Sequence, residues 1–91
     1  MKPSRLQAVV DLFSMLADPT RMLIAVLLAR GSKPVKALCY ELNQRQSVIS
    51  HHLNLLRTTG MVGRERKGRE VHYSLNRKAL EPARAFLANL K

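Results

Sequence analysis

The spacing of apolar residues changes abruptly at Gly60, and this change limits the folds open to the chain. Before it, apolar residues in positions 46–59 recur every three or four residues, which predicts a helix. After it, positions 61–66 and 70–75 alternate between apolar and polar residues, which predicts two strands with Gly68 in the turn between them. A helix followed directly by a short hairpin is therefore the predicted centre of the fold.

Helical spacing predicts further helices on both sides of this centre, over residues 4–17, 20–30 and 35–42 before it and residues 76–90 after it. Asp18 and Asn76 are suited to cap the helices that follow them, Pro19 to a first helical turn and Gly31 to a helix end. The second helix is apolar on nearly every side, so we expect it to be buried. A short polar break at residues 43–45 joins the third and fourth helices. The order ααααββα therefore predicts a mainly α fold with a small β-hairpin, a winged helix-turn-helix.

Size and charge narrow the possible partners. The 91 residues, 46% of them apolar, are predicted to form a single domain over positions 1–91. The net charge is +10, from 16 Lys and Arg against 6 Asp and Glu. An excess of this size favours a polyanionic partner, either nucleic acid or an anionic membrane surface.

The outward side of the fourth helix favours duplex DNA. The predicted inward stripe comprises Ile49, His52, Leu53 and Leu56. The opposite side carries short hydrogen-bonding side chains and no acidic residue, whereas solvated helix faces usually mix Glu with Lys. Side chains of this kind read base edges in the major groove, and neighbouring arginines hold phosphates. On this helix, the predicted DNA-binding residues are Gln46, Ser47, Ser50, His51, Asn54 and Arg57.

The hairpin that follows carries four cations within six residues. Beside a polar helix, such a ribbon is suited to contact phosphates. A charged strand edge that discourages aggregation is the alternative, and we expect Glu65 and Glu70 to pair partly with the arginines. On the second strand, Val71, Tyr73 and Leu75 should point inward, with His72 on the exposed face. The predicted DNA-binding residues of the hairpin are Arg64, Arg66, Lys67 and Arg69.

Three segments resemble the ArsR/SmtB family of bacterial winged-helix repressors: LADPTR at residues 16–21, SHHLNLLRTTGMV at 50–62 and GREVHYSL at 68–75. The resemblance implies a homodimeric repressor on a palindromic operator, released when an inducer is sensed. It also implies base-reading positions at Gln46, Ser47, Ser50 and His51, and a dimer interface through the first and last helices. Both terminal helices carry apolar stripes that a second copy could cover. The predicted interface residues are Leu6, Val9, Val10, Phe13, Leu80, Ala83, Leu87 and Leu90.

The sensor site departs from the family pattern. Metal-sensing members carry two or three cysteines on the helix before the DNA-reading helix, which here is the third helix. In this sequence that segment reads PVKALCYEL, with Cys39 alone and with Pro34 and Lys36 at the other ligand positions. One thiol cannot hold a soft metal, and residues 76–91 contain no His, Asp or Cys. His51 and His52 point to different faces and cannot chelate one ion. We therefore predict neither metal nor cofactor. Cys39 is interpreted as a small buried apolar residue, with a redox-sensing thiol as the alternative.

Other classes of function remain as alternatives. A winged helix that binds an acidic protein partner and an RNA-binding adaptor are both compatible with the charge. An enzyme is not expected, since no carboxylate pair, catalytic triad or glycine-rich phosphate loop is visible. A single cysteine, no signal peptide and a longest apolar run of residues 22–29 predict a cytoplasmic protein. The residues leave the sensed signal, the operator and the sign of regulation open.

Overall fold

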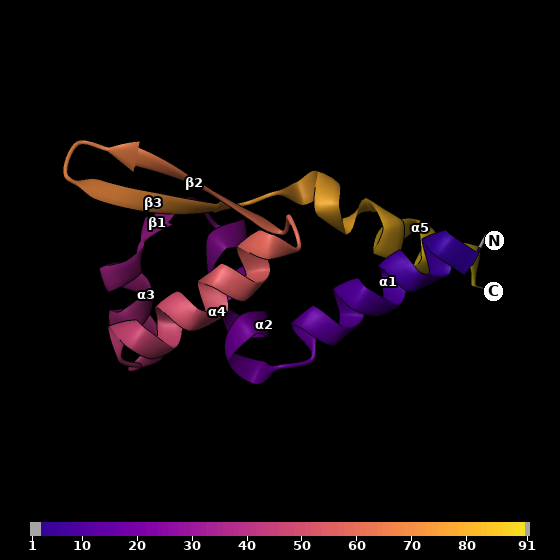
Figure 1. The fold of residues 1–91 in the computed structure, drawn as a ribbon, viewed down its shortest axis with the longest axis horizontal. Helices are drawn as coiled ribbons and strands as arrows, with labels where there is room; N and C mark the ends of the chain where they lie inside the picture. Colours follow the sequence, from indigo (N-terminus) through magenta and orange to yellow (C-terminus); the bar gives the residue numbers. More distant parts are fainter. Residues whose placement is uncertain (1–2, 91) are drawn as a thin grey trace.

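A computed structural model describes residues 3–90 of the chain (Figure 1). Its elements, in order, are α1 (Pro3–Leu16), α2 (Pro19–Ala29), β1 (Lys33–Pro34), α3 (Val35–Leu42), α4 (Gln46–Thr58), β2 (Val62–Lys67), β3 (Glu70–Leu75), the 3₁₀ helix η1 (Arg77–Leu80) and α5 (Glu81–Asn89). The molecule is elongated, with extents of 44 × 24 × 20 Å. Helices α1 and α5 lie side by side at one end of the long axis, and α3 and the tip of the hairpin lie at the other. The predicted order of four helices, hairpin and final helix is confirmed.

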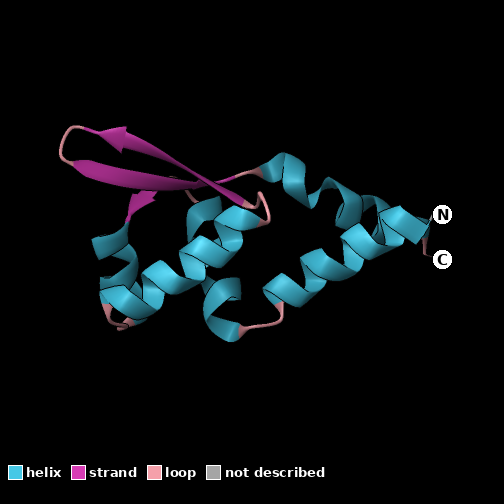
Figure 2. Ribbon diagram, in the orientation of Figure 1, coloured by secondary structure: helices cyan, strands magenta, loops and turns pink. Residues whose placement is uncertain are grey.

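The hairpin is anchored to the helices through β3. Within residues 3–90, the strands form one antiparallel sheet in the order β1-β3-β2, and Gly68 takes a φ of +64° in the turn. Strand β1 was not predicted, because two residues show no alternation; Lys33 pairs with Tyr73 and Pro34 with His72. Beyond this attachment the hairpin projects past the helices (Figure 2).

The core lies where α2, α3 and α4 meet the base of the hairpin. The α4 stripe is confirmed, since Ile49, Leu53 and Leu56 are fully buried and His52 is half-buried. They pack with residues from the neighbouring elements, among them Ile24, Leu28, Leu38, Met61, Val62 and Tyr73. On β3, Tyr73 points inward as predicted. His72 is half-buried rather than exposed, because β1 pairs beside it.

Two expectations about packing are wrong. Helix α2 fully buries only Ile24 and Leu28 within the described chain, because the other helices and β3 cover it on one side. Leu27 is half-buried against the core, and Met22, Leu23 and Val26 are exposed. Asn76 makes no side-chain cap. Its amide donates to the Gly60 carbonyl at 2.9 Å and so ties the end of β3 to the end of α4.

The final helix also begins later than predicted. Residues 77–80 form a 3₁₀ turn, and α5 starts at Glu81. Pro82 explains the break, because proline has no N–H to donate to the turn before it and fits only the first turn of an α-helix.

Helix ends position α4 against its neighbours. Asn43 takes the left-handed conformation at φ 52°, and Gln44 donates its N–H to the Cys39 carbonyl at 3.1 Å, which ends α3 sharply. At α2, Arg30 occupies the end position expected of Gly31, which follows it at φ +146°. The cap at the start of α2 is confirmed: the Asp18 carboxylate accepts the N–H of Arg21 at 3.0 Å.

This cap should make stability sensitive to acid. The Arg21 N–H chiefly, and the charges of His52 and Arg21 in addition, hold the pKa of Asp18 below its ordinary value of 3.8. A lowered pKa in the folded chain contributes stability that is full above the ordinary pKa and lost as pH falls through the lowered value. Asp18→Asn keeps a good cap without this titration. Urea unfolding at about pH 6 and pH 3 should therefore show a smaller acid loss in the variant; an equal loss would contradict this.

No single helix within residues 3–90 is long and apolar enough to cross a membrane. Helices α1 and α2 reach that length and composition only when taken together, and they bend by 96° where they meet.

Candidate nucleic-acid interface

The outward side of α4 carries the predicted DNA-binding residues of this helix on one face. Burial of Ile49 and Leu53 on the opposite side of the helix leaves this face toward solvent. Ser50 is half-buried and the other predicted residues of the face are exposed. No acidic side chain lies on α4. The exposed members are Gln46, Ser47, His51, Asn54 and Arg57.

The hairpin presents its cations beyond the core. From Val62, which is buried, the side chains of β2 become progressively exposed toward the turn. Among residues 3–90, no carboxylate lies within salt-bridge distance of Arg64, Arg66, Lys67 or Arg69. Unpaired guanidinium and ammonium groups on a ribbon of this kind are free to meet phosphates.

The expected pairing of the two hairpin glutamates with these arginines is therefore wrong. Glu70 instead accepts from Lys36 of α3, with Oε2 and Nζ 3.0 Å apart, and its Oε1 lies 3.7 Å from Nε2 of His72. The ammonium group of Lys36 chiefly, with His72 in addition, holds the pKa of Glu70 below its ordinary value of 4.5. The carboxylate thus fastens the hairpin to α3, and the cations of the hairpin stay unneutralised.

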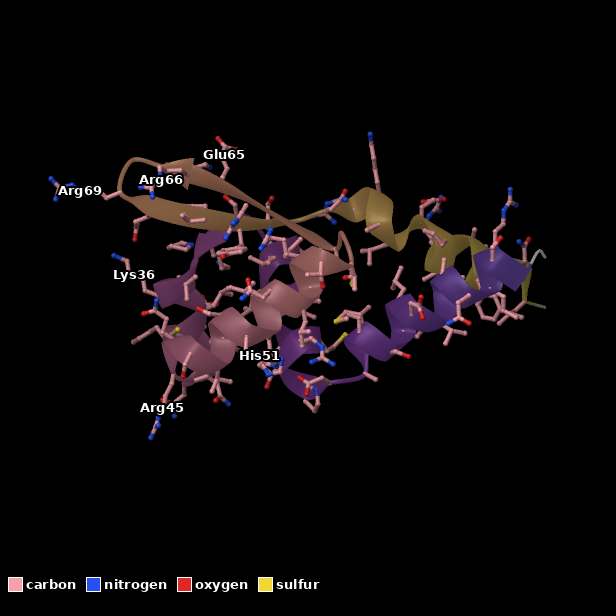
Figure 3. The ribbon with its side chains drawn as sticks, in the orientation of Figure 1. Lys36, Arg45, His51, Glu65, Arg66 and Arg69 are labelled. Carbon is pink, nitrogen blue, oxygen red and sulfur yellow. The ribbon has the colours of Figure 1, made fainter. Side chains whose placement is uncertain are left out.

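A groove connects the polar helix to the hairpin. It holds about 360 Å³ and lies between β1, the start of α3, α4 and β3. Gln46 and Ser50 are the α4 residues that line it, so they lie on the side of α4 that faces the hairpin. His51 lies along the opposite edge of α4 (Figure 3). The predicted base-reading residues therefore span the width of the exposed helix face. The lining residues are Pro34, Val35, Lys36, Gln46, Ser50, Glu70, Val71 and Tyr73.

Three residues that were not predicted extend this surface. They are Lys36, Tyr40 and Arg45. Lys36 and Arg45 lie at the end of the molecule away from the termini, as do the predicted Arg66 and Arg69 of the hairpin (Figure 3). The Lys36 side chain is 81% exposed although it pairs with Glu70, and Tyr40 of α3 is 88% exposed. Lys36 and Tyr40 are four residues apart on one helix and share a face. The sequence could have indicated these residues, because Lys36 and Tyr40 are spaced to share a helix face and Arg45 follows in the next turn.

The predicted dimer residues fall into two groups. Val9 and Ala83 are buried within one protomer, and Leu80 is half-buried. The rings of Phe13 and Phe86 meet edge to face, with centroids 6.4 Å apart, and so join α1 to α5. The remaining members, here called the apolar row, are exposed side chains of α1, of α5 and of the residue that follows α5: Leu6, Val10, Phe13, Leu87 and Leu90.

Residues suited to hold a metal do not come together in the described part of the chain. No group of three or more His, Cys, Asp or Glu side chains could hold an ion there. Cys39 is half-buried and packs against the core from α3. The His51 and His52 rings lie 5.5 Å apart, centroid to centroid, at 61° to each other.

Comparison with known proteins gives a consistent set of relatives. Residues 18–63 match the family described as bacterial regulatory protein, arsR family. The chain is 44% identical over 68 residues to the arsenical resistance operon repressor of Escherichia coli (strain K12), covering 74% of this chain and 58% of that protein. It is 33% identical over 79 residues to the transcriptional repressor SdpR of Bacillus subtilis (strain 168), covering 87% of this chain and 88% of SdpR. The solved ArsR-like transcriptional regulator from Rhodococcus sp. RHA1 superposes with a TM-score of 0.81 at 28% identity, covering 91% of this chain and 78% of that one.

Proposed function

Because the chain belongs to the arsR family of bacterial regulatory proteins, we propose that it is a DNA-binding transcriptional repressor acting as a homodimer on an inverted-repeat operator. The family and the winged helix-turn-helix fold predicted from the sequence motifs are confirmed. The relatives are transcriptional regulators, not enzymes. The chain spans little more than half of the Escherichia coli repressor, and residues 1–91 are proposed to form a single DNA-binding domain.

One observation carries this proposal: a helix face without acidic residues lies beside four cations that have no carboxylate partner within residues 3–90. In the proposed complex, α4 enters the major groove with its N-terminal residues against base edges. The hairpin cations then lie along the backbone or the adjoining minor groove. Lys36, Arg45 and Tyr40 add phosphate contacts from α3 and the turn, since the first helix of this motif crosses the backbone.

The second protomer is proposed to pack on the apolar row of α1 and α5. That row is exposed and lies at the opposite end of the molecule from the hairpin tip. A two-fold dimer built there carries two α4 helices outward, and each would read one half-site. Half-sites about one helical turn apart, roughly 34 Å, follow from this geometry. A regulator of this kind works beside the chromosome, so the cytoplasm is its proposed location.

Repression is proposed to be independent of a thiophilic metal held on α3. Cys39 is the single thiol in the sequence, and Pro34 and Lys36 stand at the positions where metal-sensing family members would carry the other ligands. Packing of Cys39 against the core supports a role as a small apolar side chain, rather than as an accessible redox sensor.

Selection of bound duplexes from a random pool tests the proposal. Recovery of an inverted repeat, bound by two protomers, is the expected result. A pool that shows no enrichment in a low-salt buffer would contradict DNA readout and favour a module that binds an acidic protein. Adding a structured RNA as competitor in the same assay tests the RNA-binding alternative, which predicts that the RNA displaces the duplex.

Arg66→Ala combined with Arg69→Ala should weaken binding to every duplex alike. Each phosphate contact contributes about −0.9 to the slope of log affinity against log salt, so the slope should become shallower by about 1.8. At moderate salt the affinity should fall on the order of tenfold. Fluorescence anisotropy over a salt series measures both quantities.

The matched control for this pair is Arg30→Ala with Lys78→Ala. It removes the same charge from exposed positions outside the hairpin and α4. An equal change of slope in the control would mean that net charge, and not the hairpin, determines the effect.

Gln46→Ala combined with His51→Ala should change base preference while leaving the salt slope near that of the unaltered chain. A lost base contact costs about 1–3 kcal/mol of discrimination at its position. Repeating the duplex selection with the variant measures this change. Thr58→Ala is the control, because its hydroxyl, at the far end of α4, donates to the Leu55 carbonyl at 2.8 Å. If sequence preference survives in the double variant, the proposed orientation of α4 is wrong.

A further inference from the structure

A part-buried polar cluster connects α4 to the junction of α1 and α2. Arg21 donates Nε–H to the Met15 carbonyl at 2.7 Å, and its Nη1 lies 3.3 Å from Nδ1 of His52. The Asp18 carboxylate accepts the backbone N–H of Arg21 at 3.0 Å and lies 3.9 Å from the same His52 nitrogen. One guanidinium therefore joins the last turn of α1 to the middle of α4.

The chemistry of the cluster assigns the roles of its two partners. Arginine has only donors, so in its contact with Arg21 the Nδ1 atom of His52 is the acceptor. The His52 side chain is 14% exposed, and the charged groups that face it are the Arg21 guanidinium and the Asp18 carboxylate. On α4 itself, His52 is followed by the fully buried Leu53 and preceded by His51, a proposed base-reading residue. A displacement of His52 consequently moves the reading face.

Arginine is suited to this task because its planar fork holds two acceptors at a fixed angle. A lysine has one flexible ammonium group and does not impose that angle. The two acceptors here belong to different elements: the Met15 carbonyl to the proposed dimer helix and His52 to the proposed reading helix.

We propose that Arg21 and His52 are positioning residues that set the orientation of α4 relative to α1, and so the separation of the two α4 helices in the dimer. This inference rests on the proposed function. It adds that the preferred distance between operator half-sites depends partly on a contact between two residues of the same protomer.

The test uses the duplex recovered by the unaltered chain, together with duplexes whose half-sites lie one or two base pairs closer or farther apart. Arg21→Lys keeps the charge and loses the fork. His52→Leu removes the acceptor, whereas His52→Asn places an amide oxygen near the Nδ1 position. Arg77→Lys is the matched control, because Arg77 donates from Nη2 to the Ala29 carbonyl at 2.8 Å and thereby joins elements other than α4.

Arg21→Lys and His52→Leu should each lower affinity for the selected spacing about tenfold, and the double variant little more, because residues of one network are not additive. Both should discriminate less between spacings, while sedimentation shows an unchanged dimer. His52→Asn should restore the preference, and Arg77→Lys should behave as the unaltered chain.

Several results would overturn the inference. One is an unaltered affinity and spacing preference in Arg21→Lys or His52→Leu. Another is a His52→Asn variant whose spacing preference is as weak as that of His52→Leu. A loss of binding that matches the unfolded fraction in a melting curve, with the spacing preference kept, would show a purely structural role. If the unaltered chain binds no duplex, the proposed function fails and the inference with it.

Discussion

A chain with both Val10→Asp and Leu87→Asp should be a folded monomer that binds a two-half-site duplex about a thousandfold more weakly than the unaltered chain. The two side chains are 47% and 55% exposed on adjacent helices, so a charge there is tolerated in one protomer. In a dimer interface the same carboxylates would be buried without partners. Loss of the dimer removes the bivalent gain, which reaches 10²–10⁴-fold in typical cases. Sedimentation and anisotropy measure the two effects.

The control is Ser14→Asp with Ala88→Asp, which adds the same charge to exposed positions outside the apolar row of the same helices. It should remain dimeric and bind as the unaltered chain does. A dimeric Val10→Asp, Leu87→Asp variant would place the interface elsewhere, and the exposed α2 residues Met22, Leu23 and Val26 would then be the next surface to test.

Ile49→Ala should destabilise the fold by about 2–5 kcal/mol. Ile49 is a fully buried residue on the inner side of α4. Removing its outer carbons leaves a cavity that the close-packed surroundings fill only in part. A domain of this size has about 5–14 kcal/mol of stability in total, so the loss is a large share of it. Urea unfolding should show a lower midpoint, with weaker DNA binding at temperatures where the variant begins to unfold.

Val48→Ala is the comparison for this substitution, since Val48 is the adjacent residue and only half-buried. It should cost about 1 kcal/mol or less. Equal losses at the two positions would mean that α4 does not bury the Ile49 side as described.

The two predictions address different regions of one elongated molecule, the terminal helices and the α4 core. The apolar row of α1 and α5 lies at one end, and the hairpin tip and α3 lie at the other (Figure 1). The α4 core and the Arg21 cluster lie between them. A change in dimer geometry can therefore reach the reading face through this middle region, which is why the Arg21–His52 contact is a useful place to measure coupling.

Much of the fold could be predicted because it depends on local patterns. Helical spacing located α4 to within a residue of its observed end, and alternation located β3 over residues 70–75. The exposed face of α4 and the exposed hairpin cations followed from the same periodicity. Asp18 followed from its side-chain chemistry, because an N-cap needs only the three residues after it.

Three of the differences from the predictions share another cause. Strand β1 exists because β3 pairs with it, Asn76 bonds to Gly60 rather than to its own helix, and Glu70 pairs with Lys36. Each involves residues far apart in the sequence, and their own neighbours give no sign of the partner.

The sequence by itself therefore determined which segments are helix or strand, which side of each is polar and where positive charge gathers, since these properties arise within a few residues. Only the tertiary structure decided which apolar sides remain uncovered, which carboxylate fastens the hairpin and which guanidinium reaches α4. Those outcomes depend on distances across the packed molecule, and such distances are set by the arrangement of all the elements together.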